Sequence, residues 1–106
     1  MDLDNAIDLI IGLAKNGRKE VYNKLSENSL IELKEYSIQE VIRSLQNFFN
    51  DLNYLYRDNQ IKDISGNATV YFQNIHSNGY IKKITFIKEA EEWKIVWNLN
   101  AFLNYR

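Results

Sequence analysis

Apolar residues recur three or four positions apart through the first half of the chain, which is the spacing of amphipathic helices. Residues 4–15 predict a first helix that begins with Asp4 as its cap and ends before Gly17. Residues 38–51 predict the most regular helix of the chain. Its apolar positions are Ile38, Val41, Ile42, Leu45, Phe48 and Phe49.

Two shorter helical segments are expected between these helices. Residues 18–25 predict a short second helix, and Ser29 with Glu32 three positions later predicts a capped helical turn. The same pattern, formed by Ser37 and Glu40, precedes the helix that begins at residue 38. The first half of the chain is therefore expected to be helical.

From residue 52 onward the apolar spacing falls to two, and β-branched and aromatic residues predominate. The predicted strands are residues 54–64, 67–75, 80–88 and 92–103. Turn-forming segments separate them at residues 65–67, 77–79 and 89–92. Short connections between consecutive strands imply an antiparallel meander. The predicted fold class is therefore α+β, with N-terminal helices packed on a four-stranded antiparallel sheet.

The turn at residues 77–79 can close as a two-residue turn or as a three-residue loop, and a one-residue difference flips every side chain. The three-residue loop pairs Phe72 with Ile84 and Val70 with Phe86, which keeps the apolar residues on one face, so we expect it. The face toward the helices then holds Ala68, Val70, Phe72, Ile84, Phe86, Trp93, Ile95, Trp97 and Leu99. The outer face holds Thr69, Tyr71, Gln73, Ile75, Ile81, Lys83, Thr85, Ile87, Lys94, Val96 and Phe102.

This outer face is rather apolar for a surface that meets only water, and large apolar patches usually mark interfaces. One interpretation is a homodimer through the outer face of the sheet. Its interface would include Tyr71, Ile75, Ile81, Ile87 and Val96. The other interpretation is an ordinary strand surface rich in threonine and isoleucine. The pattern leaves both open.

Composition narrows the function classes. The 106 residues suffice for one domain, and 45% hydrophobic with 25% charged residues is typical of a soluble globular protein. A net charge of -1 provides no field for nucleic acid or an anionic membrane. Cysteine is absent, which excludes disulfides and cysteine-ligated zinc. The apolar run at residues 9–14 is too short to span a membrane, so we expect a soluble domain, cytoplasmic or, where a leader has been removed, extracytoplasmic.

Four segments carry a family resemblance: "NGRKEVYNKLSE" (16–27), "GNATVYF" (66–72), "NGYIKKITFIKE" (78–89) and "EWKIVW" (92–97). They resemble the nuclear transport factor 2-like superfamily, especially its small bacterial lumazine-binding-like members. The resemblance implies a single domain over residues 1–106, in which helices pack on the concave face of a curved sheet to form a cone. Family enzymes place an acidic base with a tyrosine or histidine inside the cone. No such set aligns with this sequence, so the resemblance bears on the fold and not on activity.

Candidate chemistry gathers near the turn at residues 77–79. The single histidine, His76, shares the inner-face parity with Asn74, Tyr80 and Lys82, and convergent polar groups beside an apolar concavity are typical of a ligand pocket. His76 is also a candidate acid or base, as is Asp63 in or next to the first strand. The alternative is that these side chains are solvated at a hairpin tip and a sheet edge.

Three functions are compatible with these observations. The first is a non-enzymatic binding or assembly domain, a homodimer with a pocket for a small apolar ligand. Its candidate ligand-binding residues are Phe72, Asn74, His76, Tyr80, Trp93 and Trp97. The second is a cofactor-independent isomerase or cyclase that uses His76 or Asp63. The third is a soluble domain of an envelope or secretion assembly. No metal or cofactor is expected in any of them.

Overall fold

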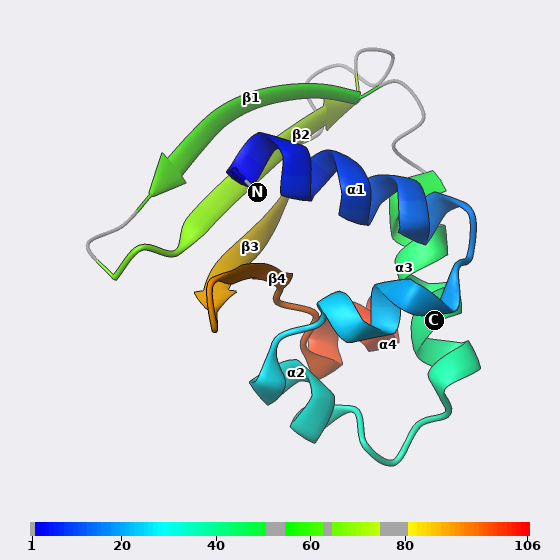
Figure 1. Ribbon diagram of the computed structural model, residues 1–106. Helices are drawn as coiled ribbons and strands as arrows, with labels where there is room; N and C mark the ends of the chain where they lie inside the picture. The colour runs from blue at the N-terminus through cyan, green and yellow to red at the C-terminus, as the bar shows by residue number, and fades with distance from the viewer. Residues whose placement is uncertain (1, 51–54, 63–64, 75–80) are drawn as a thin grey trace.

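The fold combines N-terminal helices with an antiparallel sheet, as the change of apolar spacing predicts (Figure 1). The structure is a computed structural model whose described residues are 2–50, 55–62, 65–74 and 81–106; for residues 55–62, 73, 74 and 81 only the backbone is described. The elements are α1 (Leu3–Lys15), the 3₁₀-helix η1 (Lys19–Lys24), α2 (Glu27–Glu32), α3 (Ile38–Asn50), β1 (Leu55–Lys62), β2 (Ala68–Asn74), β3 (Ile81–Glu89), β4 (Glu92–Ile95) and α4 (Leu99–Tyr105).

Helix α1 starts at Leu3, one residue before the predicted cap Asp4. The N–H of Asn5 donates to Asp2 Oδ1 at 2.8 Å, so Asp2 and not Asp4 is the cap. The earlier start buries Leu3 in the core, one turn before Ile7. The predicted end is confirmed, because Gly17 adopts a φ of 63°, a left-handed conformation that favours glycine.

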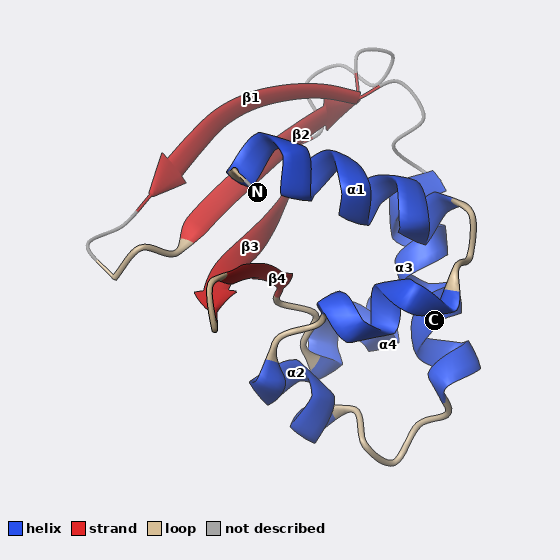
Figure 2. Ribbon diagram, in the orientation of Figure 1, coloured by secondary structure: helices blue, strands red, loops and turns tan. Residues whose placement is uncertain are grey.

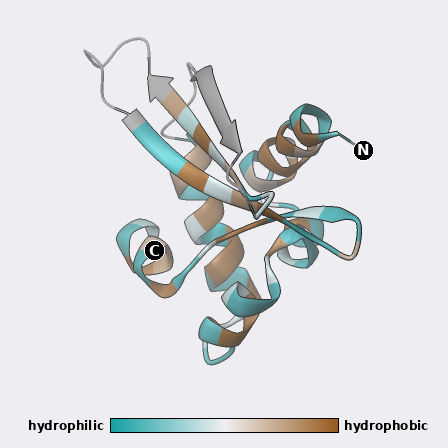
Figure 3. Ribbon diagram, turned by 90° about the vertical axis from the view of Figure 1, so that its left-hand side faces the viewer, coloured by the Kyte–Doolittle hydropathy of each residue, from teal (hydrophilic) through white to brown (hydrophobic). Residues whose placement is uncertain are grey.

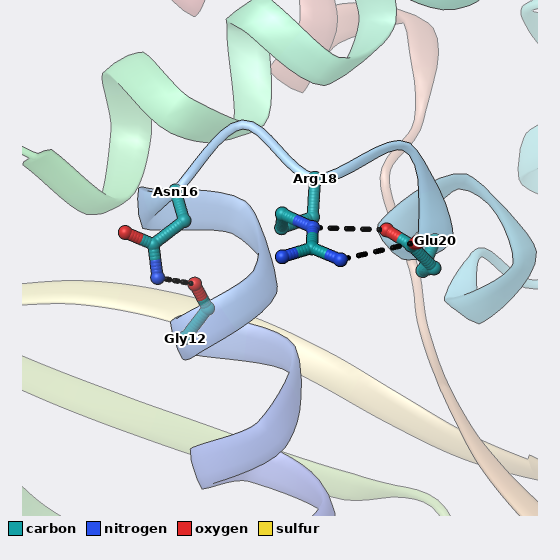
Figure 4. Close-up of polar contacts among 4 residues, drawn as sticks. All are labelled: Gly12, Asn16, Arg18 and Glu20. Carbon is teal, nitrogen blue, oxygen red and sulfur yellow. Dashed lines mark hydrogen bonds and ion pairs between the residues drawn. The ribbon is translucent and has the colours of Figure 1, made fainter.

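Polar contacts stabilise the end of α1 and the start of η1 (Figure 4). Asn16 Nδ2 donates to the carbonyl of Gly12 at 2.9 Å, and Arg18 forms an ion pair with Glu20 at 3.3 Å. A hydrogen bond to its own backbone, followed by the bond from Arg18, lowers the pKa of the Glu20 carboxyl. Both side chains are largely exposed, so the pair fixes a local geometry more than it stabilises the fold.

Of the two caps predicted for α2 and α3, one is confirmed and one is wrong. Ser37 caps α3 as predicted, since its hydroxyl accepts the N–H of Glu40 at 3.1 Å. The predicted cap at Ser29 is wrong. Helix α2 is capped by Ser26, whose hydroxyl accepts the N–H of Ser29 at 3.2 Å, and Ser29 itself lies buried inside the helix.

The strands follow one another across the sheet in the order β1-β2-β3-β4, and all neighbours are antiparallel. The predicted pairing of β2 with β3 is wrong by two residues, because Val70 faces Ile84 and Ala68 faces Phe86. The side-chain period of a strand is two, so this shift leaves the predicted faces unchanged. The buried face is confirmed for Ala68, Val70, Phe72, Ile84, Phe86, Trp93 and Ile95. Figure 3 shows apolar and more polar residues alternating along the coloured part of β2.

The prediction of a last strand over residues 92–103 is wrong beyond Ile95. The chain leaves the sheet there and forms α4, whose cap Asn98 accepts the N–H of Ala101 at 2.9 Å. Phe102, expected on the outer face, is fully buried in α4, and its ring centroid lies 4.5 Å from that of Tyr36. Leu99, expected on the inner face of a strand, is the first residue of α4 and packs against the core.

The turn between β3 and β4 is a two-residue turn whose central residues, Ala90 and Glu91, have φ values of 48° and 68°. Side chains other than glycine, asparagine and aspartate are unfavourable in this left-handed region. Replacing Glu91 with glycine is therefore expected to raise the free energy of unfolding by about 0.5–1 kcal/mol. Urea unfolding would measure the difference, with Glu92→Gly in the extended strand as a destabilised control. A Glu91→Gly protein no more stable than the wild type would contradict this.

The helices pack on one face of the sheet (Figure 2), and the core lies between the two layers. The largest fully buried side chains come from both layers and from α4. They are Trp97, Phe49, Phe72, Phe86, Phe102, Ile7, Ile10, Leu25, Leu33, Leu45 and Ile95. The core therefore joins α1, η1, α3 and α4 to β2, β3 and β4.

Candidate functional site

The predicted ligand-binding residues do not form one group. Phe72 and Trp97 are 1% exposed and belong to the core, whereas Trp93 is 9% exposed and reaches the surface. Asn74 ends β2, and its side chain is not described. Tyr80 and both catalytic candidates, His76 and Asp63, lie outside the described residues, as does the interface candidate Ile75.

Trp97 is bonded through both of its nitrogens to buried serine hydroxyls. Its backbone N–H donates to Ser29 Oγ at 2.8 Å, and its indole Nε1–H donates to Ser44 Oγ at 2.9 Å. The Ser44 hydroxyl in turn donates to the carbonyl of Val41 at 2.6 Å. Because the serines lie on α2 and α3, these bonds fix the chain after β4 to two helices. A buried polar group costs little when it is paired in this way.

The contact between Ser29 and Ser26 extends this hydrogen-bond network to the N-terminal cap of α2. Ser29 Oγ lies 2.7 Å from Ser26 Oγ, and the backbone N–H of Ser26 donates to the carbonyl of Ile95 at 2.9 Å. Residues 25 and 26 thus run beside β4 on the side opposite β3, where Leu25 forms a parallel bridge with Ile95. We did not predict this network. The signal for Ser44 was present, however, because this residue lies between Val41, Leu45 and Phe48 on the apolar face of α3.

Aromatic rings fill the interior between α3, α4 and the sheet. Phe48 of α3 packs edge-to-face with Trp97 and Tyr105, at centroid distances of 5.3 and 4.8 Å. Phe49 meets Phe72 of the sheet at 6.2 Å. These contacts are the preferred aromatic geometry. Trp97 and Phe72 are therefore packing residues in the described part of the molecule.

Trp93 lines a small hollow at the surface. The hollow has a volume of about 180 Å³ and lies between α1, the end of η1 and the turn that follows β3. Its lining residues are Ala6, Leu9, Ile10, Lys24, Glu91, Glu92 and Trp93. The base is apolar and the rim carries both signs of charge. This volume is below the roughly 300–1,000 Å³ typical of ligand pockets, so it suits a single side chain or a very small molecule.

The Glu92 carboxylate on the rim of this hollow is paired with Lys94, which lies outside the lining. Lys94 Nζ lies 3.1 Å from Glu92 Oε2 and also donates to the carbonyl of Asn23 at 2.8 Å. The hydrogen bond from Lys94, and then its charge and that of Lys24, lower the pKa of the Glu92 carboxyl. This carboxylate thus contributes stability at pH values above the ordinary pKa of glutamate, and the contribution is lost as the pH falls through the lowered pKa.

A second hollow lies beside β3, where β4 has ended. It has a volume of about 370 Å³ and is open to solvent. Residues 82–85 of β3 form one side, and Ala101 and Tyr105 of α4 form the other. Lys82 Nζ lies 4.5 Å from the ring centroid of Tyr105 and 5.0 Å from that of Phe48. We did not predict this hollow, because it exists only where the last strand is short.

Within the described ranges, no group of three or more histidine, cysteine, aspartate or glutamate side chains could hold a metal ion. None of the helices described is long and apolar enough to cross a membrane. A scan against protein-family models and a search of curated proteins find nothing that matches this chain. The resemblance to the nuclear transport factor 2-like superfamily therefore stays a prediction.

Proposed function

We propose that this protein is a non-enzymatic binding or assembly domain that forms a homodimer through the outer face of its sheet. The observation that carries the proposal is that all the buried strand residues point toward the helices, and the opposite face holds no buried residue among the described side chains. Near β4 this face is reached by η1 and α2, through the bonds of Lys94 to Asn23 and of Glu89 to Glu27. Its side chains in β2, β3, β4 and the following residue are Thr69, Tyr71, Lys83, Thr85, Ile87, Glu89, Glu92, Lys94 and Val96.

The pairing of these side chains suits association with a second copy. Thr69 faces Thr85 across the strands, and Ile87 faces Lys94. The charge of Lys94 is paired with Glu92 at 3.1 Å, so burial of the neighbouring apolar surface leaves no free ammonium group there. A net charge of -1 gives two copies almost no mutual repulsion.

The interior supports a binding or assembly role more than a catalytic one. Trp97, Phe72 and Phe48 fill the described part of the interior, and the isomerase alternative requires a pocket in the interior. That alternative depends on His76 and Asp63, outside the described residues, and stays a prediction. Within this proposal, a small apolar ligand would bind in the surface hollow lined by Trp93 and Ile10, which is the part of the predicted ligand set that reaches solvent.

The experiment is light scattering on the wild-type protein and on Ile87→Glu. The wild type is expected to have twice the 12.6 kDa mass of one chain, and Ile87→Glu is expected to be monomeric, because burying an unpaired carboxylate opposes association. Ile31→Glu is the matched control, since Ile31 is 57% exposed on α2, away from the sheet. A monomeric wild type, or an Ile87→Glu protein that keeps the dimer mass and its circular dichroism spectrum, would exclude this interface.

A further inference from the structure

Strand β3 extends well beyond its neighbour β4, which exposes part of its backbone (Figure 1). Strand β4 pairs with Phe86–Glu89, and the last bond between the two segments is from the N–H of Val96 to the carbonyl of Thr85, at 2.9 Å. After Val96 the chain turns away toward Asn98 and α4. Residues 81–84 of β3 therefore have no strand partner on this side among the described residues.

The alternation of backbone groups identifies which of these residues has an open donor and acceptor. In an antiparallel sheet, the N–H and C=O of successive residues point to opposite neighbours. The carbonyl of Thr85 points toward Val96, so the backbone groups of Lys83, two residues earlier, point to the same side. Those of Ile84 point to its partner Val70 in β2. The N–H and C=O of Lys83 thus face the 370 Å³ hollow described above.

The hollow has the shape and surface that an added strand requires. Its far side is α4, where Ala101 is small and partly exposed and Tyr105 provides an aromatic wall. A strand laid beside Lys83 would place the side chain opposite Lys83 on the outer face. The two side chains next to it would point inward, toward Tyr105 and Ala101. Apolar side chains suit these two inner positions.

The charges of residues 82 and 83 indicate which type of residue suits the position of the added strand that lies opposite Lys83. Lys82 and Lys83 are adjacent, and the Lys83 side chain is exposed. A carboxylate directly opposite Lys83 forms a favourable cross-strand pair. A second copy of the chain, paired through the same edge, would instead bring two pairs of lysines together, and like charges opposite each other are unfavourable. An acidic partner therefore fits the edge better than a second copy.

We propose that the open edge of β3 at Lys83 binds an extended peptide of a partner protein, in which an acidic residue is flanked by apolar ones. The peptide continues the line of β4, antiparallel to β3. The peptide backbone accepts a hydrogen bond from the N–H of Lys83 and donates one to its C=O. The carboxylate of the peptide pairs with the Lys83 ammonium, and the apolar side chains of the peptide enter the hollow. Binding of this kind derives affinity from main-chain hydrogen bonds and specificity from alternate side chains. It uses the edge of β3, which adjoins the proposed dimer interface and shares the Lys83 side chain with it.

The test is amide hydrogen exchange followed by nuclear magnetic resonance, with the synthetic peptide Ac-TVDVT-NH2 as probe and Ac-TVKVT-NH2 as its control. In the free protein the amide of Lys83 is expected to exchange fast, while that of Ile84, bonded within the sheet, is protected. At saturation the acidic peptide is expected to slow exchange at Lys83 at least tenfold and to leave Ile84 unchanged.

Two variants test separately how the charge of Lys83 and the shape of the groove contribute to peptide binding. Lys83→Glu is expected to weaken binding of the acidic peptide about fivefold and to favour the lysine peptide, whereas Lys34→Glu, the same charge change at an exposed site on another surface, changes neither. Ala101→Trp is expected to fill the groove and abolish binding. Protection of the Lys83 amide in the free protein that grows with protein concentration would assign the edge to a second copy and overturn the proposal. Absence of binding by both peptides at millimolar concentration, or equal binding of the two peptides by the wild type, would also overturn it.

Discussion

Replacing Trp97 with alanine should lower the free energy of unfolding by about 3–5 kcal/mol, the largest loss expected from a single truncation in this protein. Trp97 is 1% exposed, and its ring contacts Phe48 and Tyr105 at centroid distances of 5.3 and 6.0 Å. A small domain has about 5–15 kcal/mol in total, so the variant would be close to unfolding at room temperature. The cost arises because the rings around the indole belong to two helices and cannot both move into the space that it leaves.

Thermal unfolding measured by circular dichroism would test this expectation. A loss of this size corresponds to a melting temperature lower by roughly 12 °C or more for a domain of about 100 residues. Leu103→Ala on α4 is the matched control, because Leu103 is 46% exposed and its truncation is expected to change the stability little. Equal losses in Trp97→Ala and Leu103→Ala would show that the indole is not a central packing residue.

The two tryptophans illustrate which part of the fold the sequence predicts. The alternation through Trp93, Ile95 and Trp97 correctly predicts that all three point toward the helices. It cannot predict depth, because a strand pattern has no information on what lies above it. In the structure Trp97 fills the interior, whereas Trp93, near the turn that follows β3, lines a hollow at the surface. The same residue pattern therefore serves packing at one end and a candidate site at the other.

The errors in the prediction have local physical causes. Residues 99–103 satisfy the period of a strand and that of a helix equally well, and a short apolar run does not decide between them. The cap at Asn98 and the burial of Phe102 against Tyr36 decide for the helix. The two-residue error in pairing β2 with β3 has a different cause. It preserves both faces of the sheet, so no hydrophobic pattern could have detected it.

The error in the last strand matters for function, because the second hollow exists only where β4 ends early. A last strand over residues 92–103 would have covered β3 along its whole length and left no open edge at Lys83. The early end of β4 at Ile95 exposes this edge, and α4 then forms the other side of the groove. Candidate sites formed by the ending of an element are thus harder to predict than sites formed by a motif, since element boundaries are the least certain part of any pattern.

Removing the hydroxyl of Ser44 is expected to give the second large loss, about 1–3 kcal/mol in Ser44→Ala. Alanine is the better helix former, and the change removes a single oxygen from a helix interior. The loss arises because the indole N–H of Trp97, which donates to Ser44 Oγ at 2.9 Å, remains buried without an acceptor. Urea unfolding of the wild type and the variant would measure it.

A double-mutant cycle with Trp97→Phe separates this cause from a simple packing defect. Phenylalanine has no ring N–H, so in that background Ser44→Ala removes no partner and is expected to be neutral or slightly stabilising. The difference between the two backgrounds, about 1–2 kcal/mol, is then the coupling between the indole and the hydroxyl. If Ser44→Ala costs the same in both backgrounds, the serine acts through its volume, and the hydrogen bond that joins α3 to the segment after β4 contributes little to stability. A large coupling would instead show that the position of this segment, and with it the early end of β4, depends on a buried polar pair.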